Sequence, residues 1–286
     1  MVVIGHIGQA IPGLRVFTPL GAIGVGIFLI CSGYGIEKSY TKNGRDKYWY
    51  KRIVNVWLPY AIVEILALPL HWGMGWQAIL KDFTFVQPLN PFGWYMQFLF
   101  IWYILYYVTT FANKYKLPLM VLAGFIIWLT GDSLHAQNAF SFAIGVALAQ
   151  MKSIGNLWKK KYLLIALSMS LVCFFVRDYV KLHHHNINLL WNGVSLSYYL
   201  ALIFSVVIGY KLLSNHKVWL PYNGLIVVGV YSYELYLLHG YAYKVLAAPA
   251  IILMVTEFAA ICIVCTYILH KFNNIILNLI KNKISR

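Results

Sequence analysis

Long apolar runs separated by short polar segments make up almost the whole chain. A helix that crosses a bilayer needs about 20 mostly apolar residues, and nine runs approach or reach that length. These runs are 17–36, 53–72, 92–112, 117–131, 138–151, 162–177, 189–213, 225–246 and 248–270. The pattern predicts an all-α, polytopic membrane helix bundle in which each run forms one spanning helix.

The opening stretch, MVVIGHIGQAI at 1–11, is apolar but far too short to cross a bilayer. It has neither the basic n-region nor the small-residue cleavage site of a signal peptide. We interpret it as the second half of a tenth spanning helix, truncated at its N-terminus, and expect further apolar residues upstream. The prediction is therefore about ten transmembrane helices in a single domain over residues 1–286, since no repeat, linker or shift in composition divides the chain.

Composition supports this interpretation. Of the 286 residues, 61% are hydrophobic and 11% are charged, whereas soluble domains are about 45–50% apolar and about 25% charged. These values exclude both a water-soluble globule and a disordered chain. All four cysteines lie inside apolar runs, so we predict no disulfide.

Basic residues outnumber acidic ones by 23 to 8, which gives a net charge of +15. With the N-terminal side of the first helix in the cytoplasm, 18 of the 23 basic residues fall in inward-facing segments. The inward segments are 37–52, 113–118, 151–162, 211–217 and 271–286. This is a strong positive-inside asymmetry. It explains the basic charge without nucleic acid and predicts a multi-pass protein of the inner or plasma membrane with both termini cytoplasmic.

Some residues in the apolar segments are not required to form a simple helix bundle. An ionisable group in hydrocarbon is costly and is usually functional or paired, but a lone histidine such as His6 is more often a hydrogen-bonded core group. Small residues share one face of 21–36 and permit close helix approach, and the Ser32 hydroxyl could simply bond to its own helix. The basic loop 38–52 serves as a topology anchor or as a docking surface for a phosphorylated cytoplasmic ligand.

An ordered series of motifs favours functional over purely structural interpretations of these residues. The series consists of His6, GVGIFLICSGYGI at 24–36, KRIVNVWLPY at 51–60, WY at 94–95 and YSYELYLLH at 231–239. Together it resembles the acyltransferase type 3 family of membrane sugar O-acyltransferases, and the resemblance covers nearly the whole chain. It implies an enzyme that moves an acyl group, commonly acetyl, from cytoplasmic acyl-CoA to a hydroxyl of a cell-surface polysaccharide or its lipid-linked precursor.

The resemblance also implies roles for particular residues. His6 matches the family's essential first-helix histidine, and Ser32 matches the serine of its F-x-x-S-G motif. Arg52 matches the first arginine of the R-x-x-R step. Two departures stand out, because the chain starts too late to contain the family arginine about ten residues before the histidine, and Asn55 replaces the second arginine. Acyl-CoA binding would then rest on Arg52 and Lys51, with Lys47 in the same loop.

Acyl transfer needs a base for the hydroxyl proton and donors for the developing oxyanion. His6 is the natural base, acting directly or carrying the acyl group itself, and these two routes stay open. Ser32 and Tyr60 are the candidate oxyanion donors.

Three further residues are candidates for orienting the catalytic groups. Glu64 and Glu234 could each orient a catalytic histidine or pair structurally with a Tyr, Lys or His. His239 is as readily a packing group as a catalyst.

The expected partners are acyl-CoA as co-substrate, a sugar hydroxyl of a glycan or lipid-linked glycan, and the lipid bilayer. We expect no bound cofactor, no metal and no nucleic acid, and a homo-oligomer stays open. The run His183, His184 and His185 need not converge on a metal. The alternatives are a transporter or flippase for polysaccharide intermediates, although paired repeats with broken helices are not evident, and an inactive partner of a glycan synthase.

Overall fold

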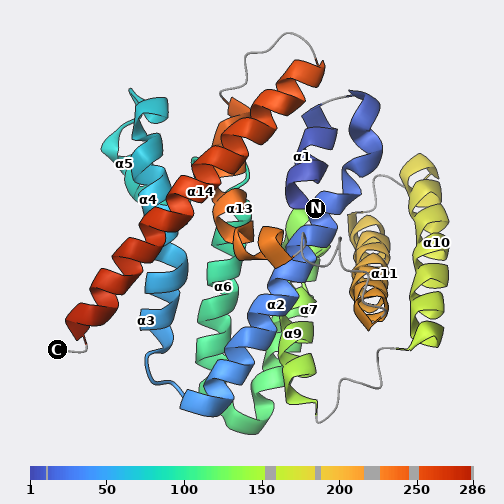
Figure 1. The fold of residues 1–286 in the computed structure, drawn as a ribbon. Helices are drawn as coiled ribbons and strands as arrows, with labels where there is room; N and C mark the ends of the chain where they lie inside the picture. Colours follow the sequence, from blue (N-terminus) through green and yellow to red (C-terminus); the bar gives the residue numbers. More distant parts are fainter. Residues whose placement is uncertain (11, 152–158, 184–187, 216–225, 245–250, 285–286) are drawn as a thin grey trace. The chain divides into compact units, whose positions relative to one another are not determined.

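The computed structural model describes residues 1–10, 12–151, 159–183, 188–215, 226–244 and 251–284. All regular secondary structure in these ranges is helical (Figure 1), which confirms the all-α prediction. Helices suit a bilayer because they satisfy their backbone hydrogen bonds internally.

The first part of the chain forms α1 (Val2–Ala10), η1 (Pro12–Phe17), α2 (Pro19–Asn43), α3 (Tyr48–Arg52), η2 (Ile53–Trp57), α4 (Leu58–Ala67), η3 (Leu68–His71) and α5 (Trp76–Phe83). The second part forms α6 (Trp94–Thr109), η4 (Thr110–Tyr115), α7 (Lys116–Thr130), α8 (Ser133–Ala136) and α9 (Ser141–Gln150). Further along the chain lie α10 (Lys160–His183), α11 (Asn188–Asn215), α13 (Ser232–Lys244) and α14 (Ile251–Ile284).

Six helical segments in the described ranges are long and apolar enough to cross a membrane. They are Gly13–Asn43, Tyr48–His71, Trp94–Thr130, Lys160–His183, Asn188–Leu212 and Val255–Leu279. The predicted count of about ten is not confirmed, and two elements show why. At about 1.5 Å per residue, the 10 residues of α9 and the 13 of α13 are shorter than a hydrocarbon core of about 30 Å.

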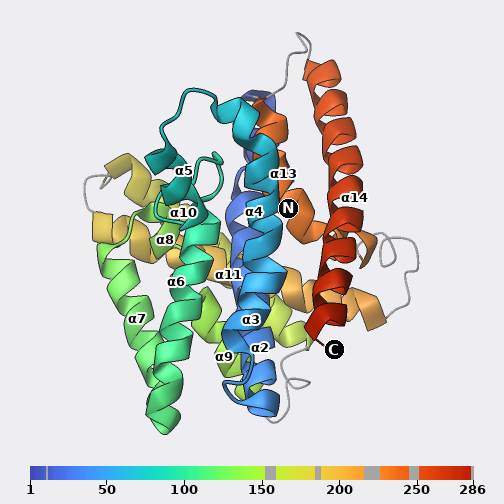
Figure 2. The same cartoon turned by 90° about the vertical axis from the view of Figure 1, so that its left-hand side faces the viewer.

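The segment Trp94–Thr130 contains two helices. Asn113 has non-helical backbone angles (φ 43°, ψ −104°) and separates α6 from α7. The chain reverses there, so that the two helices run in opposite directions (Figure 2). This break matches the two separate apolar runs that the sequence predicts at 92–112 and 117–131.

The chain divides into two compact units. Unit 1 comprises Met1–Asn43 and Phe98–Trp219, and unit 2 comprises Gly44–Gln97 and Leu220–Arg286. Each unit combines segments that lie far apart in the sequence, so a single cut in the chain would not separate them. The single domain stays a prediction.

Unit 1 is organised around a close crossing of α2 and α9. A Cβ atom built on Gly33 would lie 2.2 Å from the Phe142 carbonyl oxygen, and one on Gly145 would lie 2.1 Å from the Ile30 carbonyl oxygen. Only glycine permits such an approach of two backbones. The small residues in 21–36 therefore serve helix packing, as the sequence pattern indicated.

In unit 2, α3, η2 and α4 form one helix interrupted by a π-helical turn. Pro59 lacks an amide hydrogen and cannot donate to the carbonyl one turn earlier. The chain accommodates it with η2, in which the Leu58 amide donates to the Ile53 carbonyl. The hydroxyl of Tyr233 on α13 donates to the Val56 carbonyl at 2.7 Å. The motif at 231–239, called the late motif below, thus supports the irregular turn that follows Arg52.

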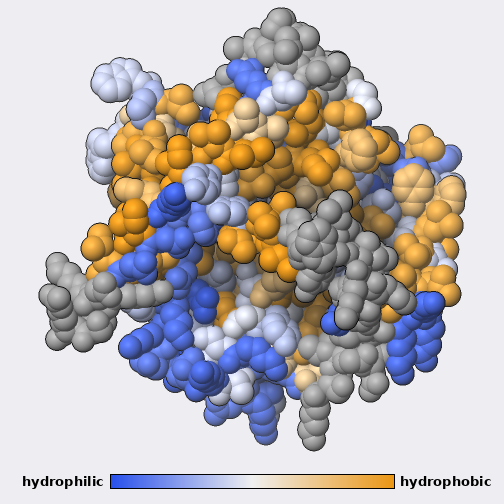
Figure 3. All heavy atoms as spheres, viewed as in Figure 1, coloured by the Kyte–Doolittle hydropathy of each residue, from blue (hydrophilic) through white to orange (hydrophobic). Residues whose placement is uncertain are grey.

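Apolar side chains are exposed along α10 and α14. Hydrophobic residues cover the first part of α14, and hydrophilic ones gather toward its C-terminal end (Figure 3). The exposed large residues include Leu164, Leu171 and Phe175 on α10 and Ile263, Ile268 and Leu279 on α14. Lipid explains this exposure, since a soluble monomer rarely exposes contiguous apolar surface of this kind. The protein is a multi-pass membrane protein.

Candidate active site

The predicted site residues divide between the two units. His6 and Ser32 belong to unit 1, whereas the remaining residues belong to unit 2. The latter are Lys47, Lys51, Arg52, Tyr60, Glu64, Glu234 and His239.

His6 lies on α1, which packs against the start of α2. A Cβ atom on Gly5 would lie 2.4 Å from the Gly21 nitrogen, so the two backbones touch beside His6, which is half-buried. Ser32 is half-buried eleven residues beyond Gly21 on the same helix, about 16 Å along its axis. His6 on α1 therefore lies beside the first part of α2, whereas Ser32 lies further along α2.

The predicted acyl-CoA residues form a basic cluster along the short helix α3, with Lys47 at its N-cap and Lys51 and Arg52 in its last turn. Lys47 is exposed and has a left-handed backbone (φ 51°), and the Arg52 guanidinium lies 5.3 Å from the centre of the Tyr48 ring. The side chain of Asn55 donates to the Lys51 carbonyl at 2.8 Å. Asn55 thus bonds its own helix where the family has a second arginine.

Tyr60 and Glu64 lie in the buried part of α4, next to polar groups that the sequence analysis did not identify. Glu64 is 2% exposed, and its Oε2 accepts a hydrogen bond from the Tyr241 hydroxyl on α13. The Tyr241 hydroxyl also lies 3.2 Å from Nε2 of His71. Because Tyr241 gives its proton to Glu64, the His71 Nε2–H is the donor in this second bond.

Asp82 of α5 brings a second carboxyl to the same place. It is 1% exposed, and its Oδ1 accepts from the Tyr60 hydroxyl at 2.6 Å and from the Leu89 amide at 2.8 Å. The Glu64 carboxyl lies within hydrogen-bonding reach of it. Unit 2 therefore contains a pair of buried carboxyls surrounded by two tyrosine hydroxyls and an imidazole.

The late motif on α13 packs against and hydrogen-bonds the segment before α6. His239 is fully buried. Its Nδ1 bonds the Tyr236 carbonyl, and its ring stacks on Phe92 at 5.0 Å between centroids. The Asn90 amide donates to the Leu237 carbonyl at 3.0 Å. Both packing and a hydrogen bond therefore hold the imidazole of His239 in one orientation.

Glu234 has a histidine partner, although not the one in its own motif. Its Oε1 lies 2.9 Å from Nδ1 of His270 on α14. The ring of Tyr231 packs edge-on against the same imidazole, with centroids 4.6 Å apart. The carboxylate therefore connects α13 to α14.

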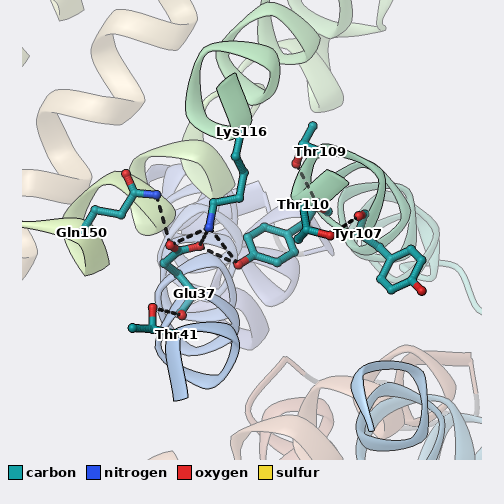
Figure 4. A network of polar contacts seen from close by, with 8 residues as sticks. Glu37, Thr41, Tyr107, Thr109, Thr110, Lys116 and Gln150 are labelled. Atoms are coloured by element: carbon teal, nitrogen blue, oxygen red, sulfur yellow. Dashed lines mark hydrogen bonds and ion pairs between the residues drawn. The ribbon is translucent and has the colours of Figure 1, made fainter. Parts of the chain in front are cut away.

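A buried ion pair in unit 1 was also missed from the sequence. Glu37 accepts hydrogen bonds from Lys116 through both oxygens, at 2.7 and 2.6 Å, and from the Tyr106 hydroxyl (Figure 4). The Gln150 side chain donates to it at 3.0 Å. Glu37 and Lys116 fall in segments that the sequence predicts to be cytoplasmic, yet both are buried. These contacts join four helices, namely α2, α6, α7 and α9.

A comparison with known proteins identifies the family. The model of the acyltransferase type 3 family, described as an acyltransferase domain, matches residues 1–269. The chain belongs to this family. No curated protein and no solved structure matches it. The match includes residues of both units.

Two apolar cavities accompany the polar clusters of the acyltransferase. The larger, of about 460 Å³, lies between α2, α9, α10 and α11, and the smaller, of about 260 Å³, lies between α13, α14 and the residues before α13. Their walls are almost entirely apolar and include neither a carboxylate nor an imidazole. They suit hydrocarbon better than acyl-transfer chemistry.

In this acyltransferase, Asp132 and His135 lie outside these clusters and bond to each other. Asp132 caps α8 by accepting from the His135 amide at 3.0 Å and from its ring at 2.7 Å. Burial favours a higher pKa for Asp132, but the hydrogen bonds from His135 outweigh it, and the pKa lies below its ordinary value. Within the described ranges, no group of three or more His, Cys, Asp or Glu could hold a metal ion. His184 and His185 lie outside the described residues.

Sequence reasoning missed Asp82, His71 and Tyr241, which complete the cluster around Glu64. Asp82 gave no signal because it lies between apolar runs, in a segment that reads as an outer loop. Tyr241 gave a weak one, since it follows the histidine of the late motif by two residues.

Proposed function

We propose that this acyltransferase is a membrane O-acyltransferase. It moves an acyl group, commonly acetyl, from cytoplasmic acyl-CoA to a hydroxyl of a cell-surface polysaccharide or of its lipid-linked precursor. The observation that carries the proposal is the family match over residues 1–269, together with the ordered motif residues that the chain retains. The basic cluster at Lys47, Lys51 and Arg52 supports an anionic donor.

The reaction needs few groups. His6 takes the proton of the acceptor hydroxyl, and the freed oxygen attacks the thioester carbonyl. The resulting oxyanion collapses and expels the coenzyme A thiolate, which ends as the thiol by accepting that proton. In the variant route, the His6 nitrogen attacks first and the sugar oxygen displaces it from the acyl group.

Ser32 and Tyr60 remain the proposed donors to the oxyanion. The Tyr60 hydroxyl already donates to Asp82, so it can reach an oxyanion only by exchanging that bond. The Ser32 hydroxyl makes no hydrogen bond to another described residue.

The enzyme assignment is tested by replacing the proposed base. His6→Ala should abolish acylation of the glycan while expression and membrane insertion stay normal, because an imidazole-to-methyl change leaves the apolar helix intact. His183→Ala, at an exposed end of α10, is the matched control and should retain full activity. The measurement is transfer of label from acetyl-CoA to a lipid-linked glycan pool. Retained transfer in His6→Ala would contradict the assignment.

The donor assignment is tested at the basic cluster. Arg52→Ala should raise the apparent KM for acetyl-CoA about tenfold or more, since a hydrogen bond to a charged group contributes about 1.5–3 kcal/mol. Lys47→Ala should raise it less, and Lys42→Ala, an exposed lysine on α2, should not change it. A short acyl thioester without nucleotide phosphates should show no such dependence. Equal and negligible effects in all three variants would favour a topology anchor.

A further inference from the structure

No salt bridge among the described residues neutralises the pair formed by Glu64 and Asp82. The cation that acts on Glu64 is Lys244, but this residue is exposed, and its ammonium group donates to the Leu89 carbonyl at 3.3 Å. Two adjacent buried carboxylates would therefore repel each other without a counter-charge.

Physical chemistry limits how such a pair can exist. Burying one ion away from water is costly, and a group in that position takes up a proton instead. Two carboxyls that share one site cannot both ionise, so the pair retains a proton. The pair then carries one negative charge rather than two.

The hydrogen bonds indicate where this proton resides. Asp82 Oδ1 accepts two hydrogen bonds, from the Tyr60 hydroxyl and from the Leu89 amide. Glu64 Oε2 accepts the bond from Tyr241. Glu64 Oε1 is buried and receives a hydrogen bond from no described residue. A proton on Oε1 would let that atom donate to Asp82 and would satisfy a buried oxygen that the donors leave unpaired.

We propose that Glu64 and Asp82 hold one proton between them at neutral pH and that Tyr241 and His71 connect this pair to the end of α4, forming a proton relay for acyl transfer. The use in acyl transfer rests on the proposed function, but the shared proton does not.

The relay balances without a co-reactant. A proton taken up at Nδ1 of His71 releases the Nε2 proton to the Tyr241 oxygen, which passes its own proton to Glu64 Oε2. The Oε1 proton of Glu64 then moves to Asp82, so that the pair holds two protons and no charge. The reverse sequence returns one proton. The pair can thus take up one proton through His71 and return it by the same route.

Infrared spectroscopy of the purified full chain in detergent tests the shared proton without any substrate. The wild-type protein should show the C=O stretch of a protonated carboxyl at neutral pH, shifted in D₂O. Glu64→Gln should abolish this band, and Asp82→Asn should shift it, because Asp82 is the acceptor of its hydrogen bond. Glu234→Gln removes a carboxylate that faces His270 and should leave the band unchanged. Absence of the band in the wild type, or its persistence in Glu64→Gln, would overturn the shared proton.

Kinetics tests the relay separately. Tyr241→Phe should keep the infrared band, because both carboxyls remain, yet lower kcat at least tenfold with an unchanged KM for acetyl-CoA and a narrowed pH profile. An unchanged kcat and pH profile in both Tyr241→Phe and Glu64→Gln would overturn the relay. If the band behaves as expected but wild-type protein transfers no acyl group, the proposed function fails and the shared proton stands.

Discussion

Each of the two units buries a glutamate, and the two glutamates are neutralised differently. Glu37 in unit 1 is 4% exposed and Glu64 in unit 2 is 2% exposed, so both are removed from water to the same degree. Glu37 receives the ammonium group of Lys116 on both oxygens. Glu64 has another carboxyl, Asp82, within hydrogen-bonding reach.

This difference separates a structural from a chemical role. An ion pair with all its hydrogen bonds made fixes the helices that supply its partners and has no reason to change protonation. A buried carboxyl pair without a salt bridge favours holding one proton, and a held proton can be exchanged. Buried charge in a membrane protein therefore has to be interpreted by its partner rather than by its burial.

The largest expected effect on stability concerns the ion pair between Glu37 and Lys116. Lys116→Met should lower the free energy of unfolding by about 3–5 kcal/mol, because it leaves Glu37 buried and unpaired. Thermal unfolding in detergent, followed by circular dichroism, measures this loss. The double variant Glu37→Gln with Lys116→Met should recover most of it. A single-variant loss below about 1 kcal/mol would remove the contrast between the two glutamates.

A smaller loss is expected where α2 and α9 hold the Glu37 site together. Gly33→Ala should destabilise the protein by about 1–3 kcal/mol, because the new methyl group overlaps the Phe142 carbonyl oxygen. Gly35→Ala is the matched control, since nothing lies within 4 Å of its Cβ position, and it should stabilise the helix by up to about 1 kcal/mol. The same unfolding assay compares the two, and equal stabilities would argue against a close α2–α9 contact.

The smallest effect on stability is expected at Glu64, whose neighbour is the carboxyl of Asp82. Glu64→Gln should change the free energy of unfolding by less than about 1 kcal/mol, since a protonated carboxyl and an amide have nearly the same shape and no charge. Glu37→Gln should cost more, because it leaves the Lys116 ammonium buried without a counter-ion. Chemical unfolding of the two variants side by side tests this, and equal losses would show that Glu64 is ionised.

The helices and the family were predictable from sequence, because both depend on local or ordered features. Apolar runs predict helices through the need to satisfy backbone groups in lipid, and the break between 92–112 and 117–131 is confirmed at Asn113. The small residues of 21–36 predicted the close contact at Gly33. The motif series predicted the family, which the match over 1–269 confirms.

Tertiary structure alone decided the partners of the buried charges. Glu37 and Lys116 are 79 positions apart, and Glu64 and Tyr241 are 177 apart, so no helical period relates the members of either pair. The positive-inside count treats Lys116 as a cytoplasmic charge. In the structure its side chain is buried within unit 1. Periodicity along one helix indicates which face is apolar, but the partner of a polar group is set by which helices pack together, and that depends on contacts over the whole chain.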